Sequence, residues 1–551
     1  MSAPNIKKVP TSPYKDQHPG TSGLRKKTRL FMENPGYAEN FIQSVFNTLI
    51  GDPDIDLSKE SLAIGGDGRY LNHEVMQTIL SMAVANGFGE ILIPRRGLIS
   101  TPAMSAVIRK RKALGGFILT ASHNPGGKEG DFGIKYNVSN GGPAPETFTQ
   151  RIYELSLSID HYFTAGDLEF QINDETEYQI GSTKISVIDP FTDYQTALEE
   201  VFDFNKIADL FKSGFRMIFD GMHGVTGIYA KHFLEHLLGA VEGTVVRGEP
   251  MPDFGGIHPD PNLVYNSFLV DKMMAEGALD FGAANDADGD RNMIFGHKLF
   301  VPPGDSVAVI TDMASRCIPG FKDGVVGVAR SMPTSTALDR VAKNLGIECF
   351  ETPTGWKYFG NLMDAGLCNI CGEESFGTGA DHVREKDGLW AVLSWLSIIS
   401  ETGKSARDIL MDHWSKYGRS YYERHDYEEM DSDKANQMFS DLKEKLPGLK
   451  GVNLSGQEIT RADEFRYVDP VTKDVSEHQG LRFFLADGSR IITRLSGTGT
   501  KGATLRIYLE QFDAENIDRD TTTMLKGLSS MAINLLEIPK YFGSSKPSLI
   551  T

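Results

Sequence analysis

Three stretches of this chain follow one order: an apolar strand, a helix, a second strand, and a third strand that ends in a polar, glycine-containing loop. They comprise 62–67, 91–94 and 116–120, then 216–221, 244–246 and 279–285, then 325–331, 348–352 and 368–372. Helical patterns follow the first strand of each set, from His73, over 228–238 and from Ser335. Buried strands alternating with helices indicate α/β layers with mixed, largely parallel sheets. Since ligands bind beyond the carboxyl ends of such strands, we expect the three loops to meet in one central cleft.

The last part of the chain has a different pattern. R-I-I-T-R-L (490–495) and A-T-L-R-I-Y-L (503–509) read as strands, whereas the chain from about Tyr421 reads as charged and broken. We interpret this part as a smaller α+β domain and 401–418 as a hinge region. The predicted domains are 1–192, 193–303, 304–406 and 407–551, in agreement with the roughly four domains that 551 residues suggest.

Composition excludes several classes of protein. The net charge of −18 argues against a nucleic-acid partner, and a small anionic substrate would need a local basic site. The four cysteines are too few for a disulfide framework. The C-x-x-C at Cys368 and Cys371 has the spacing of a redox or zinc motif, but Cys317 and Cys349 supply no second pair at ligand spacing, so we interpret these residues as buried thiols. No signal peptide is visible, and the apolar stretch 389–399 suits a core helix and is too short for a membrane span. We expect a cytoplasmic protein and interpret the basic run 109–112 as a solvated helix face.

The loop N-D-A-D-G-D-R places Asp286, Asp288 and Asp290 at alternate positions. Three carboxylates in one short turn repel each other unless a cation lies between them. An EF-hand is excluded because Arg291 and His297 occupy the sixth and twelfth positions, which require Gly and Glu. Few side-chain ligands, with room for water and a phosphate oxygen, favour Mg²⁺. The alternative is a solvated acidic turn.

The loop S-G-T-G-T-K-G (496–502) joins two strands. A dinucleotide site needs a helix next, and the chain has no H-R-D loop of a protein kinase. Glycines let backbone N–H groups approach an anion, while Ser496, Thr498 and Thr500 add hydroxyls and Arg494 and Arg506 add charge. We interpret the loop as a phosphate pocket; the alternative is a flexible hairpin tip.

Two more loops carry candidate groups. G-E-E-S-F-G (372–377) offers Glu373, Glu374 and Ser375, whose carboxylates and hydroxyl suit a polyol. In T-A-S-H-N-P-G-G (120–127), the Pro and the two glycines form a tight loop after an apolar strand. Ser122 is therefore a candidate nucleophile or phosphate carrier, and the alternative is a turn whose polar side chains bond the backbone. No G-x-S-x-G elbow is present here, which disfavours acyl transfer.

Taken in order, these loops resemble the α-D-phosphohexomutase superfamily, and its phosphoglucomutase branch in particular. The resemblance covers nearly the whole chain and includes G-T-S-G-L-R-K-K (20–27), T-A-S-H-N-P-G-G, G-D-F-G-I-K-Y-N (130–137), D-A-D-G-D-R, R-S-M-P-T-S (330–335), E-T-P-T-G-W-K (351–357), G-E-E-S-F-G, R-E-K-D-G (384–388) and R-L-S-G-T-G-T (494–500). It implies four domains around a deep cleft. Thr500 and Lys501 depart from the smaller residues of many relatives, which bears on the fine contacts of that loop.

The resemblance also implies roles. Ser122 would be carried as phosphoserine, and one of its oxygens would join Asp286, Asp288 and Asp290 around Mg²⁺. Arg25 and Arg291 would lie at the transferred phosphoryl group, with His123 and Lys135 as proton-transfer candidates. The sugar phosphate would contact Thr354, Gly355, Glu373, Ser375 and Lys386. Its non-reacting phosphate would contact Arg494, Ser496, Gly497, Thr498 and Arg506.

The implied reaction interconverts glucose 1-phosphate and glucose 6-phosphate, with glucose 1,6-bisphosphate as intermediate and activator. The partners would be small sugar phosphates, with no nucleic acid or membrane. Two alternatives remain open at this point. One is a phosphomannomutase-type sugar specificity; the other is a catalytically silent member of the family that acts as a scaffold or signalling protein.

Overall fold

The repeat expected from the sequence is confirmed by the computed structural model, which describes residues 4–20, 22–166, 168, 170–277, 279–454, 456–499 and 502–551, without the side chains of 496–499. In three sheets, the first strand of the repeat lies between the second and the third, and all three are parallel. These strands are β4-β3-β5 (Glu90–Pro94, Ser61–Gly66, Gly115–Leu119), β11-β10-β12 (Val245–Val246, Met217–Asp220, Phe281–Asn285) and β16-β15-β17 (Glu348–Thr352, Gly327–Ser331, Ile370–Gly372).

Each third strand runs into its polar loop and then into an antiparallel strand. These strands are β6 (Asp131–Val138), β13 (Asn292–Gly296) and β18 (Thr378–Ala380). The sheets are therefore mixed at one edge, as the fold class predicted. The three candidate loops occupy equivalent positions, at the carboxyl end of the last parallel strand, which is where parallel sheets place ligands.

The first sheet is the longest of the three, with the order β2-β6-β5-β3-β4-β9-β8. Its added strands are β2 (Leu24–Lys27), β9 (Thr183–Ile188) and β8 (Thr176–Ile180), and a separate pair is formed by β1 (Lys7–Pro10) and β7 (His161–Thr164). Its helices are α1 (Thr28–Glu33), α2 (Tyr37–Ile50), α3 (Asn72–Asn86), α4 (Thr101–Arg111) and α5 (Glu146–Ser156). Helices α2 and α3 contribute to one apolar cluster, whereas α4 shares a second cluster with the middle units.

The two middle sheets share that second cluster, so they are packed as one body with the inner face of the first. The second unit adds β14 (Leu299–Val301), α6 (Thr192–Glu199), α7 (Phe204–Lys212), α8 (Thr226–Ala230), a π-helical turn (Lys231–Leu237) and α9 (Ser267–Met274). The third adds α10 (Pro303–Cys317), α11 (Ala337–Leu345), α12 (Trp356–Asp364), α13 (Gly388–Thr402) and α14 (Ala406–Tyr417). Residues 389–399 are buried within α13, which confirms the predicted core helix.

The C-terminal unit is an antiparallel sheet with helices, which confirms the predicted α+β architecture. Its order is β20-β21-β24-β25-β26-β19-β27. The strands are Asn453–Leu454, Gln457–Glu464, Leu481–Leu485, Arg490–Gly499, Gly502–Asp513, Arg419–Met430 and Leu549–Ile550. Its helices are α15 (Ser432–Leu449), α16 (Thr521–Leu535) and α17 (Ile538–Phe542), and β22 (Tyr467–Val468) pairs with β23 (Val475–Ser476). Short 3₁₀ turns elsewhere span Leu57–Lys59, Arg95–Gly97, Phe254–Gly256 and Pro319–Phe321.

Two expectations for this region were wrong. The segment from Tyr421 is not broken, because it lies within the long strand β19, paired along most of its length with β26. On its helix-facing side, Glu423 and His425 lie between two buried tyrosines and bond each other at 3.0 Å. Because two of these buried positions are polar, the sequence lacks the alternating apolar pattern of a strand. The segment predicted as a hinge is mostly helix α14, whose Trp414 is buried and donates to Asp305 of α10 at 3.0 Å.

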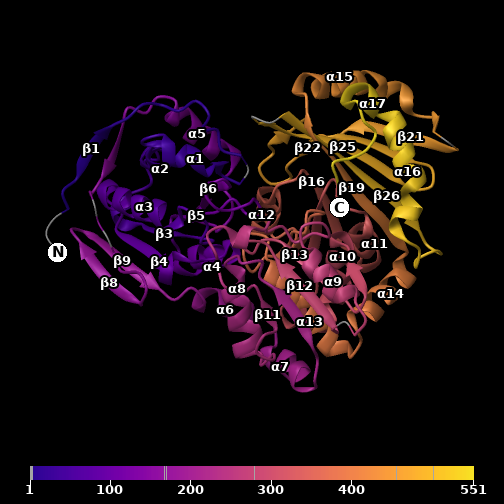
Figure 1. Ribbon diagram of the computed structural model, residues 1–551, viewed down its shortest axis with the longest axis horizontal. Helices are drawn as coiled ribbons and strands as arrows, with labels where there is room; N and C mark the ends of the chain where they lie inside the picture. Colours follow the sequence, from indigo (N-terminus) through magenta and orange to yellow (C-terminus); the bar gives the residue numbers. More distant parts are fainter. Residues whose placement is uncertain are drawn as a thin grey trace.

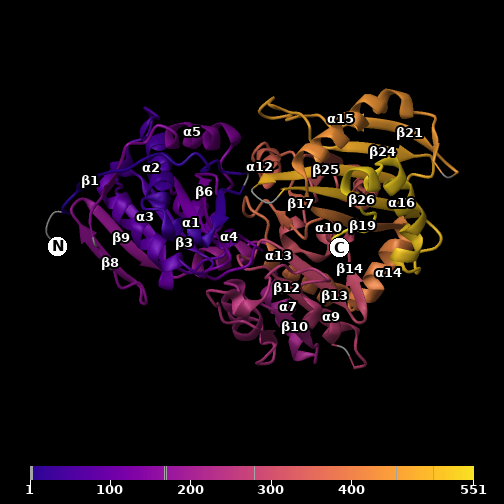
Figure 2. The same cartoon turned by 45° about the horizontal axis from the view of Figure 1, so that its top comes forward.

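The four units form a broad, bilobed arrangement. Figure 1 shows the N-terminal unit at the left, the C-terminal sheet at the upper right and the middle units between them. The same arrangement is seen in Figure 2 after a 45° rotation. Across the described ranges, no helix combines the length and the apolar character that crossing a membrane requires.

Candidate active site

Ser122 is at the centre of the loop between β5 and β6. Its backbone is left-handed, with φ of +50°, a conformation that is uncommon for a residue other than glycine. Its Oγ donates a hydrogen bond to Oδ2 of Asp286 at 2.8 Å and lies 3.3 Å from Nδ1 of His123. The side chain is almost fully buried. The strained loop therefore aims one hydroxyl directly at the acidic loop of the second unit.

A buried polar network fixes this conformation. The backbone N–H of Ser122 donates to Oγ1 of Thr120 at 2.8 Å, and its carbonyl accepts from Nη2 of Arg69 at 2.7 Å. Arg69 pairs at 2.9 Å with Asp67, and both side chains are inaccessible to solvent. Breaking a buried pair of this kind is costly, because it leaves an uncompensated charge. Sequence reasoning missed Asp67 and Arg69; the run G-G-D-G-R (65–69) at the end of β3 was the available signal.

The three aspartates lie in the loop between β12 and β13. One carboxylate oxygen of each falls within 4.8 Å of the others, and all three are buried. Thr101 donates to Oδ2 of Asp288 at 2.9 Å, but Oδ1 of Asp288 and Oδ1 of Asp290 have no hydrogen-bond partner among the residues that the structure describes. Buried, unpartnered carboxylate oxygens are unfavourable unless a cation binds them. The donor set is all oxygen, which fits a hard divalent ion.

Charge repulsion in the triad appears in its pKa values. Burial, then the neighbouring Asp288 and Asp290, raise the pKa of Asp286 well above its ordinary value. Burial also acts on Asp290, but the ammonium of Lys386 at 3.0 Å and the guanidinium of Arg291 outweigh it and lower the pKa of that carboxyl. The cluster therefore favours a bound cation over three free carboxylates.

Cationic side chains face the aspartates. Arg291 donates from its backbone to Asp286 at 3.0 Å, and its Nη1 bonds Oδ1 of Asp260 at 3.0 Å. Arg25, on β2, has a buried Nε that no group in the described part of the chain accepts from. Burial is the main cause that lowers the pKa of His123, followed by the nearby Arg291 and Arg25, so this imidazole is neutral near pH 7. Asp260, in G-I-H-P-D-P-N (256–262), was missed from the sequence.

Lys135 and Lys386 have different partners. Lys135, on β6, is buried in an ion pair with Glu385, which also accepts from Asn137 at 2.8 Å. Burial raises the pKa of Glu385, and Lys135 opposes that shift. Lys135 is therefore paired with Glu385, whereas Lys386 is paired with Asp290 of the aspartate loop.

The predicted sugar-binding residues line one wall of a cavity. Thr354, Gly355, Glu373, Ser375 and Lys386 all border it, and the backbone N–H of Gly355 donates to Oε1 of Glu373 at 3.2 Å. Burial raises the pKa of Glu373, and the nearby Lys386 offsets only part of that increase. Carboxylate, hydroxyl and backbone groups on one wall are suited to the hydroxyls of a sugar.

The C-terminal unit completes the opposite wall. Nη1 of Arg494 donates to Oγ1 of Thr354 at 2.6 Å, and Arg506 lies directly opposite Arg494 on the neighbouring strand. The side chains of Ser496, Gly497 and Thr498, and the whole of Thr500 and Lys501, lie outside the described residues. The two arginines are thus brought to the site, and the predicted contacts of the loop tip stay predictions.

The cavity between these groups has a volume of about 180 Å³. Its lining comes from all four parts of the chain and includes His123, Lys135, Asp290, Arg291, Thr354, Glu373, Ser375, Lys386, Arg424 and Arg506. Arg424 is a further residue that sequence reasoning missed. The structure thus brings the loops of His123, of Asp290 and of Glu373, together with two strands of the C-terminal sheet, to one cavity.

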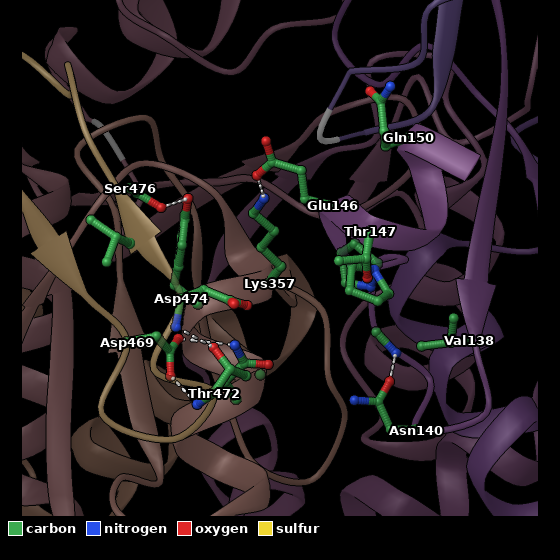
Figure 3. Close-up of a pocket in the computed structure, with 17 residues that line it drawn as sticks. Val138, Asn140, Glu146, Thr147, Gln150, Lys357, Asp469, Thr472, Asp474 and Ser476 are labelled. Atoms are coloured by element: carbon green, nitrogen blue, oxygen red, sulfur yellow. Dashed lines mark hydrogen bonds and ion pairs between the residues drawn. The ribbon is translucent and has the colours of Figure 1, made fainter. Parts of the chain in front are cut away.

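A larger cavity, of about 480 Å³, adjoins the first, and Pro143 borders both. Figure 3 shows Lys357 of α12 reaching Glu146 of α5, at 2.8 Å, on one side of it. On the other side Asn361 donates to Asp469 at 2.9 Å, and Tyr358 shares a hydrogen bond with Ser476. Helix α12, which begins directly after Thr354 and Gly355, therefore contacts both the N-terminal and the C-terminal unit.

Comparison with known proteins identifies the family. The models for domains I, II and III of phosphoglucomutase/phosphomannomutase match residues 16–163, 192–298 and 303–417, and the model for the C-terminal domain of phosphoglucomutase-1 matches 419–548. The chain is 52% identical to phosphoglucomutase of Rhizobium radiobacter, over 99% of this chain and 100% of that one. The chain belongs to the phosphoglucomutase family.

Other relatives of this phosphoglucomutase-family enzyme agree. Phosphoglucomutase 1 of Drosophila melanogaster is 48% identical, over 98% of this chain and 99% of that protein. The crystal structure of pp63/parafusin, an exocytosis-sensitive phosphoprotein and phosphoglucomutase from Paramecium in an open form, superposes with a TM-score of 0.92 at 46% identity, and each chain is covered completely. The family and the four-part fold expected from the motifs are therefore confirmed.

Proposed function

We propose that this enzyme interconverts glucose 1-phosphate and glucose 6-phosphate through a phosphorylated Ser122, with glucose 1,6-bisphosphate as intermediate and activator. One observation carries the proposal. The Oγ of Ser122 lies 2.8 Å from Asp286 of a buried aspartate triad, beside a cavity that His123 and Arg506 line and whose Thr354 is bonded by Arg494. A phosphoryl group on Ser122 and a second phosphate across the cavity would each meet positive charge.

The transfer would break the bond between Oγ of phosphoserine 122 and phosphorus, and form a bond from phosphorus to the free sugar hydroxyl. Phosphoryl transfer depends mainly on positioning and charge neutralisation. Arg25 and Arg291, whose guanidiniums interact with the aspartates, would stabilise that charge. After the intermediate turns over, its other phosphate would return to Ser122.

The hydroxyl proton needs an acceptor, and His123 is the better placed of the two candidates. Its imidazole is neutral and adjoins Ser122 Oγ, whereas the Nζ of Lys135 is already engaged by Glu385 in a buried ion pair. We therefore assign proton acceptance to His123 and proton donation, or charge stabilisation, to Lys135.

Mg²⁺ fits the triad. Asp286, Asp288 and Asp290, with an oxygen on Ser122, would hold the ion, because two of the carboxylate oxygens are buried without partners. When bound, Mg²⁺ would neutralise charge on the phosphoryl group. Gly289, with φ of +82°, allows the tight turn, and a Cβ there would lie 2.8 Å from Oγ1 of Thr226.

The substrate's non-reacting phosphate would bind Arg494, Arg506 and the loop of Ser496, Gly497 and Thr498. Since that phosphate is on C1 in one half of the cycle and on C6 in the other, a donor-rich loop suits it better than a rigid cavity. Thr354, Gly355, Glu373, Ser375 and Lys386 would contact the sugar between the two phosphate positions. Closing the C-terminal unit over the sugar would exclude water.

We also propose the four-part division at 192, 303 and 406, with one refinement. Helix α14 packs against α10 through Trp414 and Asp305, and this favours a third boundary near 417. The presence of cytoplasmic phosphoglucomutases among the relatives, such as that of Bromus inermis, supports a cytoplasmic location, although chloroplastic ones also occur.

A coupled assay with glucose 1-phosphate, with and without Mg²⁺ and glucose 1,6-bisphosphate, tests this function. We expect turnover that needs both additions and is absent in Ser122→Ala. No turnover in the wild type under any of these conditions would favour a silent scaffold. The similarity to the exocytosis-sensitive phosphoprotein of Paramecium is the observation that favours this alternative. A comparable kcat/KM for mannose 1-phosphate would favour the broader sugar specificity.

A further inference from the structure

Three neighbouring strands of the C-terminal sheet present a row of charges to the active-site cavity. Arg494 on β25 pairs in register with Arg506 on β26, and Arg506 pairs in register with Asp426 on β19. Directly opposite residues in antiparallel strands project from the same face of the sheet. Arg424 precedes Asp426 by two positions, so it projects from that face as well.

Arg424 is placed to bind an anion. It lines the same cavity as Lys386, Arg291 and Ser375, and its side chain is 14% exposed. Its Nε bonds Oδ1 of Asp426 at 3.0 Å. Within the described ranges neither of its Nη atoms has a hydrogen-bond partner, so the outer edge of the guanidinium retains its donors for a ligand.

Asp426 lies between two guanidiniums. It is buried, with Oδ1 against Nε of Arg424 and Oδ2 at 3.7 Å from Nε of Arg506. The carboxylate therefore bonds the Nε edge of Arg424 and forms a longer ion pair with Arg506, which leaves the Nη atoms of Arg424 free of it. Because Asp426 is in the middle of a long strand, it is a rigid support for both side chains.

The C-terminal side of the cavity is cationic on balance. Arg494 is bonded to neutral oxygens, those of Thr354 and Gln479, whereas Asp426 pairs with Arg424 and Arg506. Glu374, on the same cavity wall, adds a negative charge near Arg424, and its Oε2 accepts from Ser331 at 2.8 Å. Three guanidiniums against two carboxylates leave a net positive charge, which favours binding of a phosphate monoester.

We propose that Arg424 is a third phosphate-binding arginine of the C-terminal unit and that Asp426 is the positioning residue that orients Arg424 and Arg506 toward the substrate's non-reacting phosphate. This inference rests on the proposed function, which assigns that phosphate to Arg494 and Arg506. It adds a residue from a third strand to the phosphate site. It also explains why an acidic side chain lies within a site for anions.

The test compares KM and kcat for glucose 1-phosphate in Arg424→Gln, Arg424→Lys, Arg494→Gln and the control Arg466→Gln. Arg466 is exposed on the same unit and pairs with Glu477, so its substitution changes the net charge equally, away from the cavity. We expect R424Q to raise KM on the order of 10- to 100-fold, as the loss of charged hydrogen bonds implies, with kcat little changed. R424K, which keeps the charge without the fork, should give a smaller increase and remains informative if R424Q folds poorly.

The outcomes distinguish the role of Arg424 from the existence of the phosphate site at Arg494 and Arg506. If R494Q raises KM and both Arg424 variants match R466Q, the role of Arg424 is refuted and the proposed phosphate site stands. If R494Q also leaves KM unchanged, the proposed phosphate site itself fails. Equal increases in R424Q and R466Q would show a general charge effect and would refute the inference.

Asp426→Asn tests the positioning role with almost the same shape. We expect it to raise KM roughly tenfold with kcat retained, because both arginines lose their support. In the double variant R424Q/D426N, the fold-increase in KM should be smaller than the product of the two single increases, because Asp426 acts partly through Arg424. Fully multiplicative effects, or a fall in kcat without a change in KM, would contradict the positioning role.

Discussion

The contact between the C-terminal sheet and the third unit contains a buried carboxylate whose contribution to stability follows from its hydrogen bonds and its pKa. Glu510 of β26 accepts from the backbone N–H and Oγ1 of Thr336, at 2.9 and 2.7 Å, from Ser420 at 2.7 Å and from Nε of Arg490 at 2.7 Å. Burial raises the pKa of Glu510, but Arg490 and these hydroxyls outweigh it and lower the pKa to about 2, from 4.5.

The lowered pKa of Glu510 corresponds to a free energy that stabilises the folded state. Each pKa unit corresponds to about 1.4 kcal/mol, so the ionised Glu510 contributes on the order of 3 kcal/mol to the folded state. Because the folded pKa is the lower one, that stability is present above pH 4.5 and is lost as the pH falls from 4.5 toward 2. Glu510→Gln should therefore destabilise the contact by a similar amount near pH 7, because it removes the nearest counter-ion of the buried Arg490 and leaves only the more distant Glu351, at 3.9 Å.

Hydrogen exchange of peptides that cover β26 is the appropriate assay, because a chain of several units does not unfold in one step. We expect the E510Q peptides to exchange on the order of 10²-fold faster near pH 7, with the difference shrinking as the pH falls below 4.5. Glu458→Gln, an exposed carboxylate on β21 of the same unit, is the control and should exchange like the wild type. Equal protection in E510Q and the wild type, or a difference independent of pH, would refute this reasoning.

Two further predictions concern the metal loop and a second buried carboxyl. Asp288→Asn should lower kcat on the order of 10²- to 10³-fold and shift the Mg²⁺ titration of the coupled assay to higher concentration, because it removes one charged ligand; an unchanged titration would exclude Asp288 as a ligand. Burial raises the pKa of Asp305 to about 6, from 3.8, so the folded state holds its proton more tightly and wild-type stability falls as the pH rises from 3.8 to 6. Asp305→Asn, which still accepts from Trp414, should raise the melting temperature above pH 6 and not near pH 4; a loss of stability at both pH values would contradict this account.

The sequence predicted the repeat well because its signals are local. Strands such as β3, β10 and β15 are short apolar runs, and the polar loops follow the third strand of each set. The strand β19 was missed because the helix-facing positions Glu423 and His425 satisfy each other as a pair, and a one-dimensional pattern counts each of them as exposed. Helix α14 was missed because its flanks, E-T-G-K-S (401–405) and Gly418, have the composition of a linker.

The residues of the site also fall into those with a local sequence signal and those without one. Ser122 and the three aspartates are in compact motifs whose residue types indicate their chemistry. Asp67, Arg69 and Asp260 act through contacts with residues from other parts of the chain, such as the 2.7 Å bond from Arg69 to the Ser122 carbonyl. Arg424 and Asp426 become a pair with Arg506 only once β19 lies beside β26. Such groups have no signal until the strands are assembled.

The most direct test asks where the phosphoryl group resides. The enzyme is incubated with glucose 1,6-bisphosphate, quenched and digested, and the phosphate is located by peptide mass spectrometry, before and after addition of excess glucose 1-phosphate. The account predicts phosphate on Ser122, its transfer to the added sugar phosphate, and no phosphorylated peptide in Ser122→Ala. Phosphate on a different residue, or full turnover in the alanine variant, would contradict it.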